Sequence, residues 1–97
     1  MESTGVRNIV FEEIRMLAKR HQLDRVVLFG SRARGDYLRN SDIDLAVSGG
    51  NVASFALDVE EETSTLLTYD VVDIGKRIDD ELRENIEREG KTIYEKI

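Results

Sequence analysis

Residues with the potential for chemistry gather in the stretch from residue 28 to residue 47. Gly30 and Ser31 follow a short apolar run, and Asp42 and Asp44 lie two residues apart further along. A glycine lets the backbone turn tightly, so that backbone N–H groups and the Ser31 hydroxyl can face an anion. These residue types predict an anion-binding turn close to a pair of carboxylates.

Two arginines stand beside this turn. Arg32 and Arg34 follow Ser31, and a helical turn over residues 31–34 would point its N–H groups at the same anion. We therefore expect a phosphate site formed by Gly30, Ser31 and the two arginines. The alternatives are an ordinary strand-to-helix turn, and arginines that pair with the nearby acidic residues.

The carboxylate pair predicts a metal site. Asp42 and Asp44 are expected on one face of a strand, because side chains two residues apart share a face. Like charges this close raise each other's pKa unless a cation lies between them. Oxygen ligands without a Cys or a nearby His favour Mg²⁺ over Zn²⁺, and Mg²⁺ often binds carboxylates together with substrate phosphates. The alternative is a solvated polar face on an edge strand.

A further carboxylate lies on the next predicted strand. Asp70 and Asp73 fall on opposite faces of that strand, so only one of them can join the pair. A cluster of three carboxylates would hold two metal ions and would let one Asp accept the proton of an attacking hydroxyl. Periodicity alone does not choose between Asp70 and Asp73.

Alternating helices and strands must position these residues, and the spacing of apolar residues predicts where they lie. The expected elements are a helix over Val6–His21, strands over Arg25–Phe29 and Ser41–Val47, a helix over Val52–Leu66, a strand over Tyr69–Ile74, and a helix from Ile78 to Ile86 closed by Gly90. Asn51 is the expected N-cap of the second helix, and residues 92–94 form a short extension. The order α-β-β-α-β-α predicts an α+β fold, one sheet with helices packed against it.

Length and charge set limits on function. Ninety-seven residues, 40% of them apolar, suit one domain spanning residues 1–97. The net charge of −6 argues against binding to a polynucleotide or an anionic membrane. A partner subunit or a homo-oligomer would help such a small core.

The remaining composition limits the chemistry and the compartment. The absence of Cys excludes disulfides, thiolate zinc sites and a cysteine nucleophile. We expect neither a signal peptide nor a membrane span, and cytoplasm is the expected location. The single histidine, His21, lies at a predicted helix end, where we expect a surface or dipole role rather than catalysis.

The spacing of these motifs resembles a known superfamily. Gly30-Ser31, ten intervening residues and then Asp42-Ile43-Asp44 are similar to the GSx10DxD signature of the DNA polymerase beta-type nucleotidyltransferases. The segment G-S-R-A-R-G and the C-terminal segment R-E-N-I-E-R-E-G-K-T-I-Y-E resemble the minimal (MNT-type) members of this superfamily, which are found in prokaryotes. This resemblance covers about Val6 to Tyr94.

The resemblance implies a nucleotidyltransferase fold, with a small mixed sheet, and a role for each matching residue. Gly30 and Ser31 would hold a nucleoside triphosphate such as ATP, and Asp42 and Asp44 would bind Mg²⁺. The family's third carboxylate opens a strand, which favours Asp70 in Y-D-V-V-D-I, although an aliphatic residue usually stands where this chain has Tyr69.

The same resemblance suggests a partner. Minimal members often occur with a helical HEPN-domain toxin, and as antitoxins can transfer AMP from ATP to a tyrosine of that partner. The expected function is therefore Mg²⁺-dependent transfer of a nucleoside monophosphate to a hydroxyl on a partner protein. The competing hypothesis is a non-catalytic module that neutralises its partner by occlusion.

Overall fold

The computed structural model describes residues 3–97. Its elements, in chain order, are α1 (Asn8–Arg20), β1 (Arg25–Phe29), α2 (Ser31–Arg34), β2 (Ile43–Ser48), α3 (Val52–Glu62), β3 (Tyr69–Asp73), α4 (Asp80–Glu89) and β4 (Lys91–Glu95). No helix within this described range is long and apolar enough to cross a membrane.

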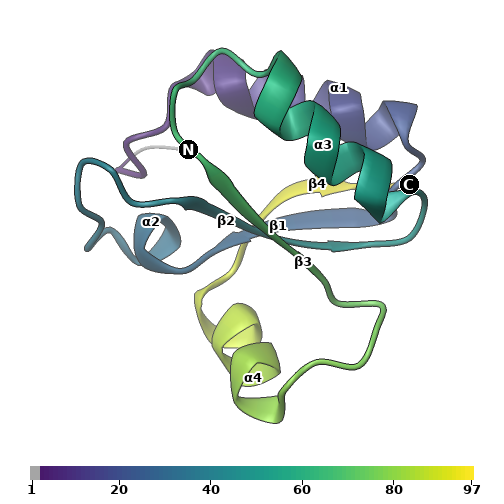
Figure 1. Ribbon diagram of the computed structural model, residues 1–97. Helices are drawn as coiled ribbons and strands as arrows, with labels where there is room; N and C mark the ends of the chain where they lie inside the picture. Colours follow the sequence, from purple (N-terminus) through teal and green to yellow (C-terminus); the bar gives the residue numbers. More distant parts are fainter. Residues whose placement is uncertain (1–2) are drawn as a thin grey trace.

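The four strands form one mixed sheet in the order β3-β2-β1-β4. β1 pairs antiparallel with β2 and with β4, whereas β2 and β3 are parallel. Parallel neighbours need a crossover, and α3 supplies it. Figure 1 shows α1 and α3 side by side on one face of the sheet and α4 on the opposite face. The predicted α+β architecture is confirmed.

Two apolar clusters, one on each face, hold these layers together. The larger cluster joins α1 and α3 to the sheet through buried side chains such as Phe11, Leu45 and Phe55. The smaller cluster lies under α4 and includes Ala46 and Ile86. Because side chains alternate along a strand, these clusters tell which face each strand residue occupies.

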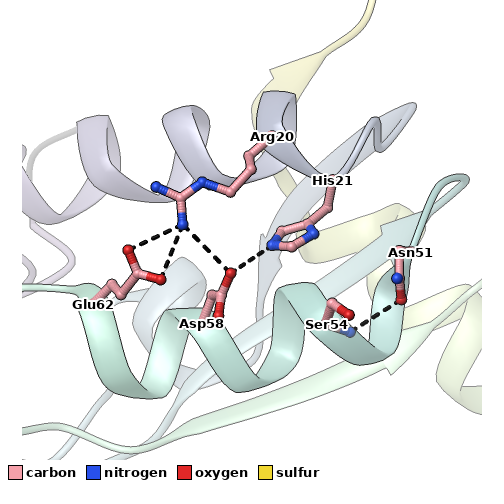
Figure 2. Close-up of polar contacts among 6 residues, drawn as sticks. All are labelled: Arg20, His21, Asn51, Ser54, Asp58 and Glu62. Carbon is pink, nitrogen blue, oxygen red and sulfur yellow. Dashed lines mark hydrogen bonds and ion pairs between the residues drawn. The ribbon is translucent and has the colours of Figure 1, made fainter.

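The packing of α1 against α3 also has a polar border (Figure 2). Arg20 donates to Glu62 at 2.9 Å, and His21 Nε2 lies 2.6 Å from Asp58 Oδ2. The hydrogen bond with His21 is the main reason why the pKa of the Asp58 carboxyl lies below its ordinary value. His21 follows the last turn of α1, as expected, but its side chain is only 14% exposed and bridges two helices rather than facing solvent.

Capping explains where α3 begins and ends. Asn51 accepts a hydrogen bond from Ser54 N at 3.1 Å, which confirms it as the N-cap (Figure 2). The expected extension of this helix to Leu66 is wrong. Thr63 has extended backbone and donates its hydroxyl to the Val59 carbonyl, and Leu66 is fully exposed.

Three further boundaries differ from the predictions. β2 begins at Ile43 rather than Ser41, because a turn in which Ser41 N donates to the Leu38 carbonyl keeps the preceding residues out of the ladder. α4 begins at Asp80, two residues after Ile78. The short C-terminal extension is a full edge strand, β4, although only Ile93 in it is buried.

Candidate functional site

The turn after β1 brings the backbone against a carboxylate. Gly30 has φ +76°, and a Cβ at this position would collide with Asp44 Oδ2. Glycine is therefore required here both by backbone conformation and by space. Ser31 begins α2 directly after this turn, as the predicted helical turn over residues 31–34 requires.

The ladder shows which of the two carboxylates of β3 shares a face of the sheet with Asp44. In the parallel ladder Asp44 lies opposite Asp70. Asp44 alternates with Leu45 of the α1/α3 cluster, and Asp70 alternates with Val71, which packs against the same cluster. Both aspartates therefore point to the α4 face of the sheet, at the end where β1 turns at Gly30.

Asp73 has a different role. It lies on the other face of β3, opposite Val47 in the ladder, and its Oδ1 accepts a hydrogen bond from Gly75 N at 2.9 Å. Asp73 is the last residue of β3, and its side chain caps the turn that follows. Tyr69, the departure from the family pattern, packs against the apolar core and contacts the Thr63 hydroxyl, and burial raises the pKa of Tyr69 to about 12.

The electrostatics of the site centre on Asp44. Burial, followed by the negative charges of Asp70 and Asp42, raises the pKa of Asp44 to about 6. Arg34 and Arg32 oppose this rise with their positive charges. A carboxyl whose pKa is raised by burial and by neighbouring carboxylates indicates a place where a cation would be stabilised.

Asp42 precedes β2 and is exposed. Its Oδ1 accepts a hydrogen bond from the Thr68 hydroxyl, while Ile43 N donates to the Thr68 carbonyl at 2.9 Å. Thr68 thus fixes Asp42 relative to the start of β3. Sequence reasoning missed Thr68, because its contact joins residues 26 positions apart and follows no periodic pattern.

The two arginines expected at the phosphates differ from each other. Arg32 is only 1% exposed, and its guanidinium donates to the carbonyls of Thr4, Arg39 and Ser41. It also stacks on the Tyr37 ring, at 4.7 Å from the ring centroid. Arg32 therefore holds the loop between α2 and β2 in place, and each of its three guanidinium nitrogens already donates to a carbonyl.

Arg34 is accessible and lies beside the cluster. Its side chain is 43% exposed and pairs with Asp36 at 3.2 Å and with Glu89 at 2.9 Å. These carboxylates raise the pKa of Arg34, chiefly through their hydrogen bonds. Arg34 thus forms ion pairs with acidic residues outside the Asp42, Asp44 and Asp70 cluster, and a guanidinium this exposed can exchange such partners for phosphate.

The donor set suits magnesium bound together with phosphate. All of the candidate ligands are carboxylate oxygens, and their mutual repulsion at Asp44 would be relieved by a cation. Among residues 3–97, however, no three His, Cys, Asp or Glu side chains form a ready metal-binding group. The residues present therefore fit Mg²⁺ held by one or two carboxylates, with substrate phosphates completing the coordination.

Comparison with known proteins agrees with this geometry. The family model described as "Polymerase beta, Nucleotidyltransferase" matches residues 12–97. The chain belongs to this nucleotidyltransferase family. It is 33% identical over 84 residues to "Putative protein adenylyltransferase MJ0604" of Methanocaldococcus jannaschii, an alignment covering 77% of this chain and 82% of that protein.

Solved structures share the fold. A crystal structure of a toxin-antitoxin with AMP-PNP has a TM-score of 0.73 and 24% identity over 89% of this chain and 73% of the other. The toxin-antitoxin MntA-HpeT mutant D39ED41E has a TM-score of 0.72 and 22% identity, with the same coverage. The predicted nucleotidyltransferase fold is confirmed.

Proposed function

We propose that this chain is a Mg²⁺-dependent nucleotidyltransferase that moves AMP from ATP to a hydroxyl on a partner protein. The observation that carries the proposal is the ladder register, which sets Asp44 opposite Asp70 on one face, against the Gly30 turn. A structural sheet has no need to bring acidic side chains together in this way, since their repulsion is a cost. Membership of the nucleotidyltransferase family supports the reaction type.

The donor nucleotide would lie at the turn. Gly30 lets its phosphates approach the backbone, Ser31 offers a hydroxyl, and Arg34 offers an exposed guanidinium. Arg32 would support this site by holding the loop between α2 and β2 rather than by contacting phosphate. This modifies the sequence-based proposal, in which both arginines contact the nucleotide.

The carboxylates would perform the transfer. In this proposal Asp70 accepts the proton of the acceptor hydroxyl, whose oxygen forms a bond to the α-phosphorus. The bond from that phosphorus to the bridging oxygen breaks, and pyrophosphate leaves. Asp42, Asp44 and Asp70 would hold one or two Mg²⁺ ions, which supply charge neutralisation for the triphosphate.

The biological role we propose is that of an antitoxin. Solved toxin-antitoxin structures share the fold, and a relative has a name that describes protein adenylylation. On that basis the acceptor would belong to a helical HEPN-type toxin in the cytoplasm, modified by this chain acting as one domain. Direct binding to a polynucleotide is not part of the proposal, since the net charge is −6.

Thermal unfolding with and without nucleotide tests the donor site. ATP with Mg²⁺ binds the native state only, so saturation at 100-fold above Kd should stabilise it by about 2.7 kcal/mol. For a domain of this size that is a rise of roughly 10–20 °C in Tm. Chelation of Mg²⁺ should abolish the rise. No rise at millimolar ATP would leave a non-catalytic module that acts by occlusion.

A further inference from the structure

An ion pair joins α4 to the short helix α2, and the chemistry described so far gives its acidic member no role. Arg34 Nη1 donates to Glu89 Oε2 at 2.9 Å, across 55 residues of sequence. Glu89 is the last residue of α4, and its side chain is only 14% exposed. The other acidic residues of α4 are exposed, and carboxylates are seldom this buried unless they are paired.

The position of Glu89 is electrostatically unfavourable without Arg34. The C-terminus of a helix carries a partial negative charge, which opposes a carboxylate in the last turn. Partial burial adds a desolvation cost. Arg88 lies 3.7 Å from Glu89, but the Arg88 side chain is 66% exposed, so this pair contributes little. Arg34 is therefore the partner that compensates the charge of Glu89.

Backbone packing fixes Glu89 near the turn that follows β1. The next strand, β4, begins at Lys91, which lies opposite Leu28 in the ladder with β1. Between them stands Gly90, where a Cβ would lie too close to the side chain of Val27. Because the end of α4 is packed this closely on β1, Glu89 is a fixed carboxylate rather than a mobile one at the surface.

Arg34 is held at two of its three guanidinium nitrogens. Nε donates to Asp36 at 3.2 Å, and Nη1 donates to Glu89. Asp36 is 65% exposed, so phosphate can readily replace it, whereas Glu89 is largely buried. The third nitrogen, Nη2, makes no hydrogen bond within residues 3–97. Arg34 therefore has donors left for a ligand while one fixed carboxylate holds its guanidinium.

The guanidinium of Arg34 lies within electrostatic reach of the candidate metal ligands. Its positive charge opposes the rise in the pKa of Asp44. Of the two arginines in this motif, Arg32 is buried against backbone carbonyls and Arg34 is exposed. A guanidinium already held in one orientation loses less entropy when it binds phosphate.

We propose that Glu89 is a positioning residue for the nucleotide: its carboxylate holds the Arg34 guanidinium in place for the phosphates and so couples the end of α4 to the donor site. Glu89 does not itself contact the nucleotide, because its charge repels phosphate. This inference rests on the proposed function, since it concerns the donor site of the same reaction.

A double-mutant cycle tests the coupling. Titration calorimetry gives the dissociation constant of ATP with Mg²⁺ for the native chain, Glu89→Met, Arg34→Met and the double variant. Methionine has a similar length to glutamate but no oxygen acceptor. Glu89→Met should weaken ATP binding about fivefold in the native chain and less than about twofold in the Arg34→Met background, because Glu89 acts only through Arg34.

Three further measurements separate positioning from folding. Glu89→Gln keeps the length and one oxygen acceptor, so it should restore part of the affinity. Glu84→Met is the matched control, since Glu84 is an exposed glutamate of α4, and it should leave the dissociation constant unchanged. In urea denaturation Glu89→Met should lose little stability, because it also removes a carboxylate from a helix C-terminus. If Glu89→Met does not fold, the cycle is run with Glu89→Gln, which should weaken binding about twofold through Arg34.

The outcomes that contradict this inference differ from those that contradict the proposed function. Equal weakening by Glu89→Met in both backgrounds would show that Glu89 does not act through Arg34. Unchanged affinity would leave Glu89 with a structural role only, and tighter binding would show that it competes with the phosphates for Arg34. In each of these cases ATP still binds the native chain, and the donor site stands. If the native chain binds no ATP, the proposed function fails, and the inference fails with it.

Discussion

Asp44 is the residue of this site with the most strongly perturbed electrostatic environment. It faces Asp70 across the ladder, touches the space that Gly30 leaves open, and has a pKa of about 6 because of burial and its acidic neighbours. In the absence of a cation, the ionised Asp44 carboxylate therefore destabilises the folded protein at neutral pH. This makes the free energy of unfolding depend on pH in a measurable way.

Stability of the metal-free protein should reflect the raised pKa of Asp44. The folded state holds this proton more tightly than the unfolded state, whose carboxyl has its ordinary pKa of 3.8. The contribution of Asp44 to stability is therefore greatest below about pH 4 and is lost as the pH rises through about 6. Asp44→Asn removes this contribution.

Urea unfolding of both proteins with a chelator, from pH 4 to pH 7, measures the effect. Relative to the native chain, Asp44→Asn should gain stability as the pH rises, and the gain should level off near neutral pH. Other titrating groups are shared by the two proteins and largely cancel. A difference in free energy of unfolding that is constant with pH would show that Asp44 is not perturbed.

Asp70 and Asp73 give a matched pair for the transfer step. Asp70→Asn should lower AMP transfer by about 10²-fold or more, since the proton acceptor is lost, while ATP should still raise Tm. Asp73→Asn, on the other face, should leave transfer nearly unchanged. Initial rates with labelled ATP decide between them. Loss of transfer in Asp73→Asn with retention in Asp70→Asn would refute the assigned roles.

At the scale of elements, the sequence singled out the candidate residues but missed how they are supported. The motif spacing singled out Gly30, Asp42 and Asp44, the resemblance favoured Asp70, and the ladder sets Asp70 opposite Asp44. The roles of Arg32 and Thr68 were not predictable, because both depend on contacts between segments distant in sequence.

Helix and strand ends show the same limit. The apolar period continued from α3 to Leu66, but a hydroxyl contact at Thr63 follows the end of the helix at Glu62. β4 was not predicted as a strand, because an edge strand buries few side chains and so shows little apolar alternation. In β4 only Ile93 is buried. Arg15 donates to the Ile93 carbonyl at 2.9 Å, a contact with α1 that no local pattern encodes.

The loop between α2 and β2 should depend on Arg32 for its stability. Arg32→Met keeps much of the apolar stem but removes the donors to three carbonyls, so we expect a loss of about 2–4 kcal/mol in the free energy of unfolding. Arg34→Met removes accessible ion pairs and should cost less than about 1 kcal/mol.

Urea denaturation and ATP titration of these two variants separate structural from ligand-binding roles. Arg34→Met should unfold at nearly the same urea concentration as the native chain but bind ATP more weakly. Arg32→Met should show the larger loss in the free energy of unfolding. Equal stability losses in both variants would contradict the distinction drawn between the two arginines.

On the scale of the whole molecule, the mixed sheet separates the larger apolar core, on one face, from the candidate carboxylates, at one end of the other face. α1 and α3 cover one face with a continuous core, and α4 covers part of the other (Figure 1). The carboxylates lie on the α4 face, at the end where β1 turns into α2.

The most direct measurement is transfer of label from ATP to the proposed protein partner, with the label on either the α- or the γ-phosphate. We expect Mg²⁺-dependent labelling from α-labelled ATP only, and a fall of about 10²-fold or more in Asp42→Asn and in Asp44→Asn, which keep the fold but lose charged ligands. Labelling from the γ-phosphate, or a native rate in both variants, would contradict this expectation.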